Sequence, residues 1–156
     1  MNGEHHYETT IKWTGNKGTG TNSYKSYERS HTIKIKHKTE VSGSSDPAFR
    51  GDATKHNPED LLISSLSACH MLWYLHLCSE AGIVVIDYID HATGIMIETA
   101  NGGGRFSEVT LNPSVVVTEQ SMFEKANKLH KKANELCFIA NSVNIPVKHN
   151  PIITAS

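Results

Sequence analysis

The segment from Asn57 to Gly82, NPEDLLISSLSACHMLWYLHLCSEAG, predicts the element around which the rest of the chain is organised. Asn57 can accept hydrogen bonds from the free amides of a first helical turn. Pro58 suits the first helical position because it has no amide hydrogen to leave unpaired. Gly82 tolerates the left-handed backbone that commonly ends a helix. Between these signals lie about 24 residues, which would form a central helix about 36 Å long.

The middle of this segment is apolar on nearly all sides, which is typical of a helix buried within a protein. A membrane-spanning helix is the alternative. Five polar residues among the 18 positions from Leu61 to Cys78, and the lack of a second long apolar run, argue against it. We therefore expect a buried helix with Cys69 halfway along it. A cysteine in such a place is most often an inert core residue.

The composition favours a single domain over residues 1–156. Fifteen basic and sixteen acidic residues, without long runs of either sign, give no electrostatic support for binding nucleic acid or a membrane surface. Three cysteines are too few for a disulfide framework, and residues 1–15 lack the pattern of a secretory signal. We expect a cytoplasmic protein with reduced thiols.

Alternation of polar and apolar residues predicts two strands before the helix, at 6–13 and 31–37. The glycine-rich segment 15–20 is interpreted as a turn, because its lysine is not followed by Ser or Thr as in a P-loop. Residues 40–56 are rich in Ser, Gly, Asp and Pro and predict a loop. Such a long loop is a candidate for function, and it carries Arg50 just before the helix.

After the central helix, residues 83–99 and 106–117 predict a long hairpin, with NGGG as its turn. Ser121 and Glu124 match a capping box that opens a second helix. The apolar positions of that helix are Phe123, Ala126, Leu129, Ala133, Leu136 and Cys137. Residues 145–153 predict a last strand at a sheet edge, because they include two prolines. This order predicts an α+β fold with antiparallel sheets.

Three cysteines allow three pairings, and helix geometry excludes one of them. Cys69 and Cys78 are separated by about 13 Å along one helix and by roughly half a turn, so they cannot form a disulfide. Cys137 ends the second helix, which can pack against the middle of the first. Cys69 and Cys137 are therefore the pair that could cycle between dithiol and disulfide. We interpret Cys78 as structural.

A thiol reacts as its thiolate, and a buried thiolate needs a positive charge or hydrogen-bond donors. Arg50 is a candidate, because its guanidinium is always charged and carries several donors. Glu59 could hold that guanidinium through a bidentate pair. Glu59 and Cys69 lie ten residues apart, about 15 Å along a straight helix. If both serve one site, we expect a partner subunit to supply one of them.

The run NPEDLLISSLSAC, which ends at Cys69, resembles the NPE(E/D)LL motif followed by small residues and AC of the OsmC/Ohr family of thiol-dependent peroxidases. The segment ANELCFIANSV at 133–143 is similar to the helix end that carries the family's second cysteine, and the order of elements agrees along nearly the whole chain. The resemblance implies an OsmC-like fold, with antiparallel sheets around a long central helix in an intertwined homodimer. It also implies cofactor-free reduction of organic hydroperoxides, with a dithiol such as the dihydrolipoamide of a lipoylated protein as electron donor.

By the same resemblance, Cys69 is expected to be the peroxidatic cysteine and Cys137 the resolving one. Arg50, in AFRGD, is expected to stabilise the thiolate, with Glu59 as its carboxylate partner. The position of this arginine, in the loop before the helix, is closer to the OsmC-like branch than to Ohr proper.

Two departures from the family pattern concern the site. Where the family commonly has Cys-Pro-Val-Ser, this chain has Cys137, Phe138, Ile139 and Ala140, which bears on the geometry of the resolving step. His70 stands where an aromatic residue such as Phe is usual, and we expect it to alter the polarity of the pocket.

Two functions remain open. The first is a peroxidase that forms a Cys69 sulfenate and then a disulfide with Cys137, in an apolar pocket lined by aromatic residues such as Phe49 or Trp73. The second is a non-catalytic dimer that binds a small hydrophobic ligand in the interface cleft. A metal site is disfavoured, because the ten histidines are scattered and the helix face of Cys69, Trp73 and His76 offers only two good ligands.

Overall fold

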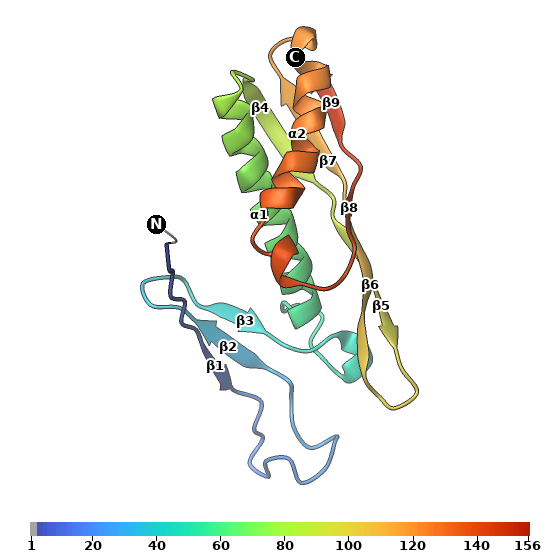
Figure 1. The fold of residues 1–156 in the computed structure, drawn as a ribbon. Helices are drawn as coiled ribbons and strands as arrows, with labels where there is room; N and C mark the ends of the chain where they lie inside the picture. Colours follow the sequence, from blue (N-terminus) through green and yellow to red (C-terminus); the bar gives the residue numbers. More distant parts are fainter. Residues whose placement is uncertain (1–2) are drawn as a thin grey trace. The chain divides into compact units, whose positions relative to one another are not determined.

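The structure is a computed structural model that describes residues 3–156. It divides the chain into two compact units, the first ending at Leu61 and the second running from Leu62 to Ser156 (Figure 1). Met1 and Asn2 lie outside the described residues. They begin the segment 1–15, which lacks the pattern of a secretory signal. The single domain expected over residues 1–156 stays a prediction.

The first unit contains a three-stranded antiparallel sheet in the order β1-β2-β3. Its strands are β1 Thr10–Trp13, β2 His31–Lys34 and β3 Val41–Gly43, followed by a 3-10 turn, η1 Pro47–Phe49. The two predicted strands are confirmed over shorter ranges than expected. The loop prediction for 40–56 is wrong where β3 and η1 form, because elements of three residues are too short to show a period.

Helix α1, Pro58–Glu80, confirms the predicted central helix and is unbroken. At its start the Asp60 amide donates a hydrogen bond to Asn57 Oδ1 at 2.7 Å, which confirms the predicted cap. At its end Gly82 has a φ of 71°, and the amide of Ile83 donates to the Cys78 carbonyl at 2.8 Å. Both ends are therefore specified by residues that lie next to them in the sequence.

Burial of α1 is one-sided, although its composition predicted burial on all sides. The fully buried residues recur every four positions and are Leu66, His70, Tyr74 and Cys78. On another face Leu72 is 63% exposed, because α2 and the sheets of the second unit cover only part of the α1 surface. Within residues 3–156, α1 alone is long and apolar enough to span a membrane, a criterion that core helices of soluble proteins also meet. The absence of a membrane span stays a prediction.

The predicted long hairpin is confirmed, and each of its arms breaks once. The strands are β4 Val85–Asp90, β5 Thr93–Glu98, β6 Gly104–Leu111 and β7 Pro113–Val117. β4 pairs with β7 and β5 with β6, both antiparallel. Where the arms bend, the Asn112 amide donates to Asp90 Oδ1 at 2.7 Å, and Asn112 Nδ2 donates to the His91 carbonyl at 2.9 Å. The hairpin therefore contributes to two sheets rather than one.

Helix α2, Phe123–Leu136, confirms the second helix but not its predicted start. A 3-10 turn, η2 Gln120–Met122, precedes it and contains Ser121. The Ser121 hydroxyl donates to the Glu119 carboxylate at 3.1 Å, and Glu124 forms an ion pair with Lys128. The predicted capping box is therefore wrong, because the 3-10 turn shifts the helix start past the serine.

The last predicted strand, 145–153, is two strands: β8 Val147–His149 and β9 Ile152–Ala155. Pro151 lies between them and has no amide hydrogen for a sheet. β8 runs parallel to β6 and β9 parallel to β7. The sheet orders β5-β6-β8 and β4-β7-β9 place both strands at edges, as predicted. The α+β class is confirmed, and these two sheets are mixed rather than wholly antiparallel.

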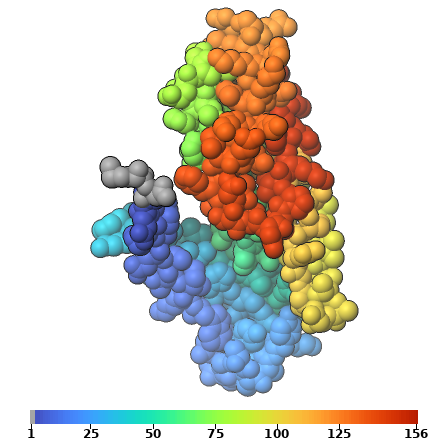
Figure 2. All heavy atoms as spheres, viewed as in Figure 1, coloured from blue at the N-terminus to red at the C-terminus, as the bar shows by residue number. Residues whose placement is uncertain are grey.

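The larger hydrophobic core of the second unit joins both helices to the β4-β7-β9 sheet. Its buried members are Tyr74, Cys78, Ile83, Val115, Val117, Ala126 and Ala133. Figure 2 shows the end of α1, in green, against α2, in orange, where Lys125 Nζ donates to the Ala81 carbonyl at 2.7 Å. This packing sets α2 along α1 and places the end of α2, at Cys137, near the middle of α1.

Candidate active site

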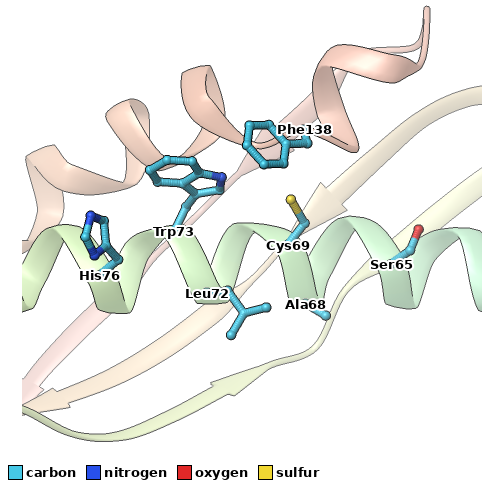
Figure 3. Close-up of a pocket in the computed structure, with 7 residues that line it drawn as sticks. All are labelled: Ser65, Ala68, Cys69, Leu72, Trp73, His76 and Phe138. Atoms are coloured by element: carbon cyan, nitrogen blue, oxygen red, sulfur yellow. The ribbon is translucent and has the colours of Figure 1, made fainter. Parts of the chain in front are cut away.

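Cys69 lies midway along α1 and lines a cavity of about 520 Å³. The lining residues are Ser65, Ala68, Cys69, Leu72, Trp73, His76 and Phe138. All but Phe138 come from α1, at the three- and four-residue spacing that places side chains on one helix face. Figure 3 shows the sulfur of Cys69 on the same side of the helix as Phe138. The half-buried thiol is therefore open to a molecule that enters this cavity.

Aromatic side chains form much of the cavity wall. The rings of Trp73 and Phe138 meet edge to face with centroids 5.7 Å apart, and Trp73 meets His76 in the same way at 5.8 Å (Figure 3). The other lining residues are small or aliphatic, apart from the hydroxyl of Ser65. Such walls favour an apolar molecule, because transferring it from water releases its hydration shell. The predicted role of Trp73 as a lining residue is confirmed.

Cys137 follows the last residue of α2 and is buried, 1% exposed. Burial raises the pKa of its thiol to about 11, and a hydrogen bond with the Cys69 side chain adds to the rise. The amide of Ala140 donates to Cys137 Sγ at 3.3 Å. The structure thus brings together the two cysteines that sequence reasoning paired, both as free thiols, with Cys137 holding its proton at neutral pH.

Cys78 is kept apart from this pair. It is 1% exposed within the core, and burial raises the pKa of its thiol. Tyr74, one turn earlier on the same helix, is buried in the same core. This environment fits the structural role expected from the sequence.

Arg50 and Glu59 both belong to the first unit, as does Phe49. Arg50 follows η1, is exposed and has a left-handed backbone, with φ 65° and ψ 29°. Non-glycine residues seldom adopt this conformation, and those that do are concentrated at functional sites. Glu59 lies in the first turn of α1. The expected approach of these side chains to Cys69 stays a prediction.

His70 does not alter the cavity polarity as expected, because its side chain is in the core. The helix turns by about 100° per residue, so the residue after Cys69 faces another side. His70 Nε2 lies 2.9 Å from His130 Nδ1, and both rings are buried. Sequence reasoning missed this contact because the two residues are 60 positions apart. Phe138 was also missed as a lining residue, since only its position after Cys137 pointed to it.

Within the described range 3–156, no three His, Cys, Asp or Glu side chains are arranged to hold a metal ion.

Comparison with known proteins identifies related chains over nearly the whole length. The family model of OsmC-like proteins matches residues 51–150. An OsmC-like protein of unknown function from Vibrio cholerae O1 biovar eltor is 28% identical, with a TM-score of 0.85 over 96% of this chain and 100% of that one. No curated protein sequence matches the chain.

Two more distant solved structures are organic hydroperoxide resistance proteins. The one from Elizabethkingia anophelis is 18% identical, with a TM-score of 0.71 over the full length of both chains, 100% of each. The one from Bacillus subtilis is also 18% identical, with a TM-score of 0.64 over 95% of this chain and 98% of that one. At this identity the likeness concerns the fold.

Proposed function

This chain belongs to the family of OsmC-like proteins, and from that premise we propose that it is a thiol-dependent peroxidase that reduces organic hydroperoxides to alcohols. The observation that carries the proposal is the contact of two free thiols, Cys69 and Cys137, beside an apolar cavity. The names of two solved structures with this fold, both organic hydroperoxide resistance proteins, support it.

The first chemical step takes place at Cys69. Its thiolate attacks the distal oxygen of the hydroperoxide, the O–O bond breaks, and the alkoxide takes up a proton to leave as an alcohol. The sulfur is oxidised by two electrons to a sulfenic acid. The aromatic wall of Trp73 and Phe138 favours an alkyl or aryl hydroperoxide over hydrogen peroxide, which has no apolar part to bury.

Cys137 supports the second step by its position and its retained proton. Its sulfur attacks the sulfenic sulfur of Cys69, and the hydroxyl leaves as water with the thiol proton. The product is a Cys69–Cys137 disulfide. A dithiol such as the dihydrolipoamide of a lipoylated protein reduces it by thiol–disulfide exchange, which restores both thiols.

The thiolate at Cys69 requires a positive charge, and we assign that role to Arg50, held by Glu59. Because α1 is unbroken, Glu59 stands about 15 Å along the helix from Cys69, too far for both to act at one site within a chain. In a homodimer, the partner subunit can supply Arg50 and Glu59 together. Cys69 then has a positive charge beside it, although the Glu59 of its own chain is too far away. The strained backbone of Arg50 supports a functional role for this residue.

A second candidate is a non-catalytic dimer that binds a small hydrophobic ligand. The observation that favours it is the same cavity of about 520 Å³, which is large enough for a small organic molecule. Titration of the reduced protein with cumene hydroperoxide, followed by a count of free thiols, separates the two. Loss of two thiols per chain at stoichiometric peroxide supports the peroxidase, and loss of none supports the binding protein.

A further inference from the structure

Three histidines from three elements meet in the core of the second unit. His70 of α1 and His130 of α2 are 1% and 0% exposed. Their rings are nearly parallel, with centroids 5.3 Å apart, and the ring of His149, on β8, lies 5.7 Å from that of His70. Tyr74 stacks on His130 at 3.8 Å. The thiol-peroxidase mechanism uses none of these side chains.

The contact between His70 and His130 joins the two helices that carry the reactive thiols. His70 directly follows Cys69, and His130 lies seven residues, about two turns, before Cys137 on the same side of α2. Apart from the contact of Cys69 with Cys137, the 2.9 Å bond between His70 Nε2 and His130 Nδ1 is the only hydrogen bond that joins side chains of α1 and α2 within residues 3–156. Loss of this bond would leave the position of α2 against α1 to apolar packing and to the Lys125 bond near the other end of α2, both less directional at the Cys137 end.

We propose that His70 and His130 are positioning residues for disulfide formation: their hydrogen bond holds the end of α2 where the Cys137 sulfur can reach that of Cys69. Neither ring lines the cavity, so the first step, the attack of Cys69 on peroxide, does not depend on them. The inference rests on the proposed function in one respect only, namely that a hydroperoxide is the oxidant that leads to the disulfide. The closure of two thiols into a disulfide can be measured without any peroxide.

In the core this bond joins two neutral rings, with one ring nitrogen donating and the other accepting. Burial lowers the pKa of His70 to about 4 and that of His130 to about 3, and burial also lowers the pKa of His149. Asp90, on β4, opposes this for His70 through its negative charge. Asp90 already accepts hydrogen bonds from Ser67 and from the Asn112 amide.

The other titratable groups around the cluster do not supply a compensating charge. Tyr74 on α1 and Tyr88 on β4 have pKa values raised by burial, so both stay neutral. When the helices separate, the imidazoles regain their ordinary pKa near 6.5 and take up protons. Separation therefore becomes easier as the pH falls below about 6.5, while above that value the paired arrangement keeps its full stability. The positioning is accordingly sensitive to acid.

Two sets of substitutions test the assignment. His130→Leu removes the bond. The double variant His70→Gln and His130→Asn retains it without a titratable ring, since a Gln amide lies near the position of Nε2 and an Asn amide near that of Nδ1. His91→Leu, at an exposed turn between β4 and β5, is the matched control.

The readout is the equilibrium constant of the Cys69–Cys137 disulfide in a glutathione buffer, measured by mass spectrometry from pH 5 to 7.5. We expect His130→Leu to lower it about five- to tenfold at pH 7.5, because His70 loses its buried partner. The double variant should match the unsubstituted chain at pH 7.5. Below pH 6.5 the constant of the double variant should fall less than that of the unsubstituted chain. Both proteins have the same thiols, so the difference between them reports the protonation of His70 and His130.

A folded His130→Leu protein with an unchanged constant would overturn the proposal. If that variant does not fold, the pH comparison decides, and an identical acid decline in the double variant and the unsubstituted chain would overturn it as well. Failure of the proposed function is seen separately. In that case cumene hydroperoxide leaves both thiols of the unsubstituted protein reduced, while the glutathione experiment still reports on the histidines.

Discussion

Cys69 and Cys78 lie nine residues apart on α1 and have opposite surroundings. Cys69 is half-buried, lines the cavity and contacts Cys137. Cys78 is 1% exposed, lies in the core beside Tyr74 and has a thiol pKa raised by burial. Nine residues correspond to two and a half turns, so the helix points the two sulfurs in opposite directions. Rotation about one helix thus separates a thiol available for chemistry from a thiol that fills the core.

The strongest test of this contrast exchanges the two sulfurs for other groups one at a time. Cys69→Ser should reduce the consumption of cumene hydroperoxide on the order of a thousandfold or more, because the nucleophile is lost. Cys78→Ala should retain the parent rate. The measurement is peroxide loss in the presence of dihydrolipoamide. A Cys69→Ser protein that turns over at the parent rate would remove the basis of the proposed mechanism.

Replacing the second thiol of the reactive pair sharpens the contrast further. In Cys137→Ser the Cys69 sulfenic acid has no neighbouring thiol, so turnover with dihydrolipoamide should fall on the order of tenfold or more. Stoichiometric peroxide should then consume one thiol per chain, and dimedone should label Cys69. Loss of two thiols in this variant would mean that Cys78 takes part, which contradicts the separation of the two environments.

The aromatic wall next to Cys69 should affect selectivity less strongly. Phe138→Ala removes the edge-to-face contact with Trp73, and such contacts contribute about 0.5 to 1.5 kcal/mol. We expect the ratio of kcat/KM for cumene hydroperoxide to that for hydrogen peroxide to fall about three- to tenfold. Phe138→Leu, which keeps an apolar side chain, is the control. An unchanged ratio in Phe138→Ala would show that this wall does not contact the substrate.

The smallest effect on activity is expected at Cys78, where the change should appear in stability instead. Cys78→Ala leaves a small void in the core, which should lower the free energy of unfolding by about 1 to 2 kcal/mol. Urea unfolding measures this. In the unsubstituted native protein, iodoacetamide should modify Cys69 well before Cys78, and rapid modification of Cys78 would contradict its burial.

The features predicted correctly from the sequence are those encoded by neighbouring residues. Asn57 and Gly82 mark the ends of α1 through bonds to adjacent turns, and the hairpin follows from local β-branched patterns. The contact of Cys69 with Cys137 was also accessible, because helix geometry excluded Cys78 and only one partner remained on another helix. The roles expected for Arg50 and Glu59 stay predictions.

The features missed depend on contacts between distant parts of the chain, or on very short elements. The hydrogen bond between His70 and His130 spans 60 positions, and no local pattern announces it. Ser121 and Glu124 match a capping box in sequence, yet a 3-10 turn competes for the same residues. The parallel pairing of β8 with β6 and of β9 with β7 is likewise set by the sheets that these strands join rather than by their own residues.

The left-handed backbone at Arg50 has a consequence for engineering. Glycine adopts this conformation freely, whereas other residues are destabilised by about 1 kcal/mol. Arg50→Gly should therefore melt at a higher temperature than Arg50→Ala, even though both lack the guanidinium. A selection for heat tolerance alone would favour glycine here, whereas the role proposed for Arg50 in peroxide reduction requires the arginine. The two requirements are opposed at one position of the chain.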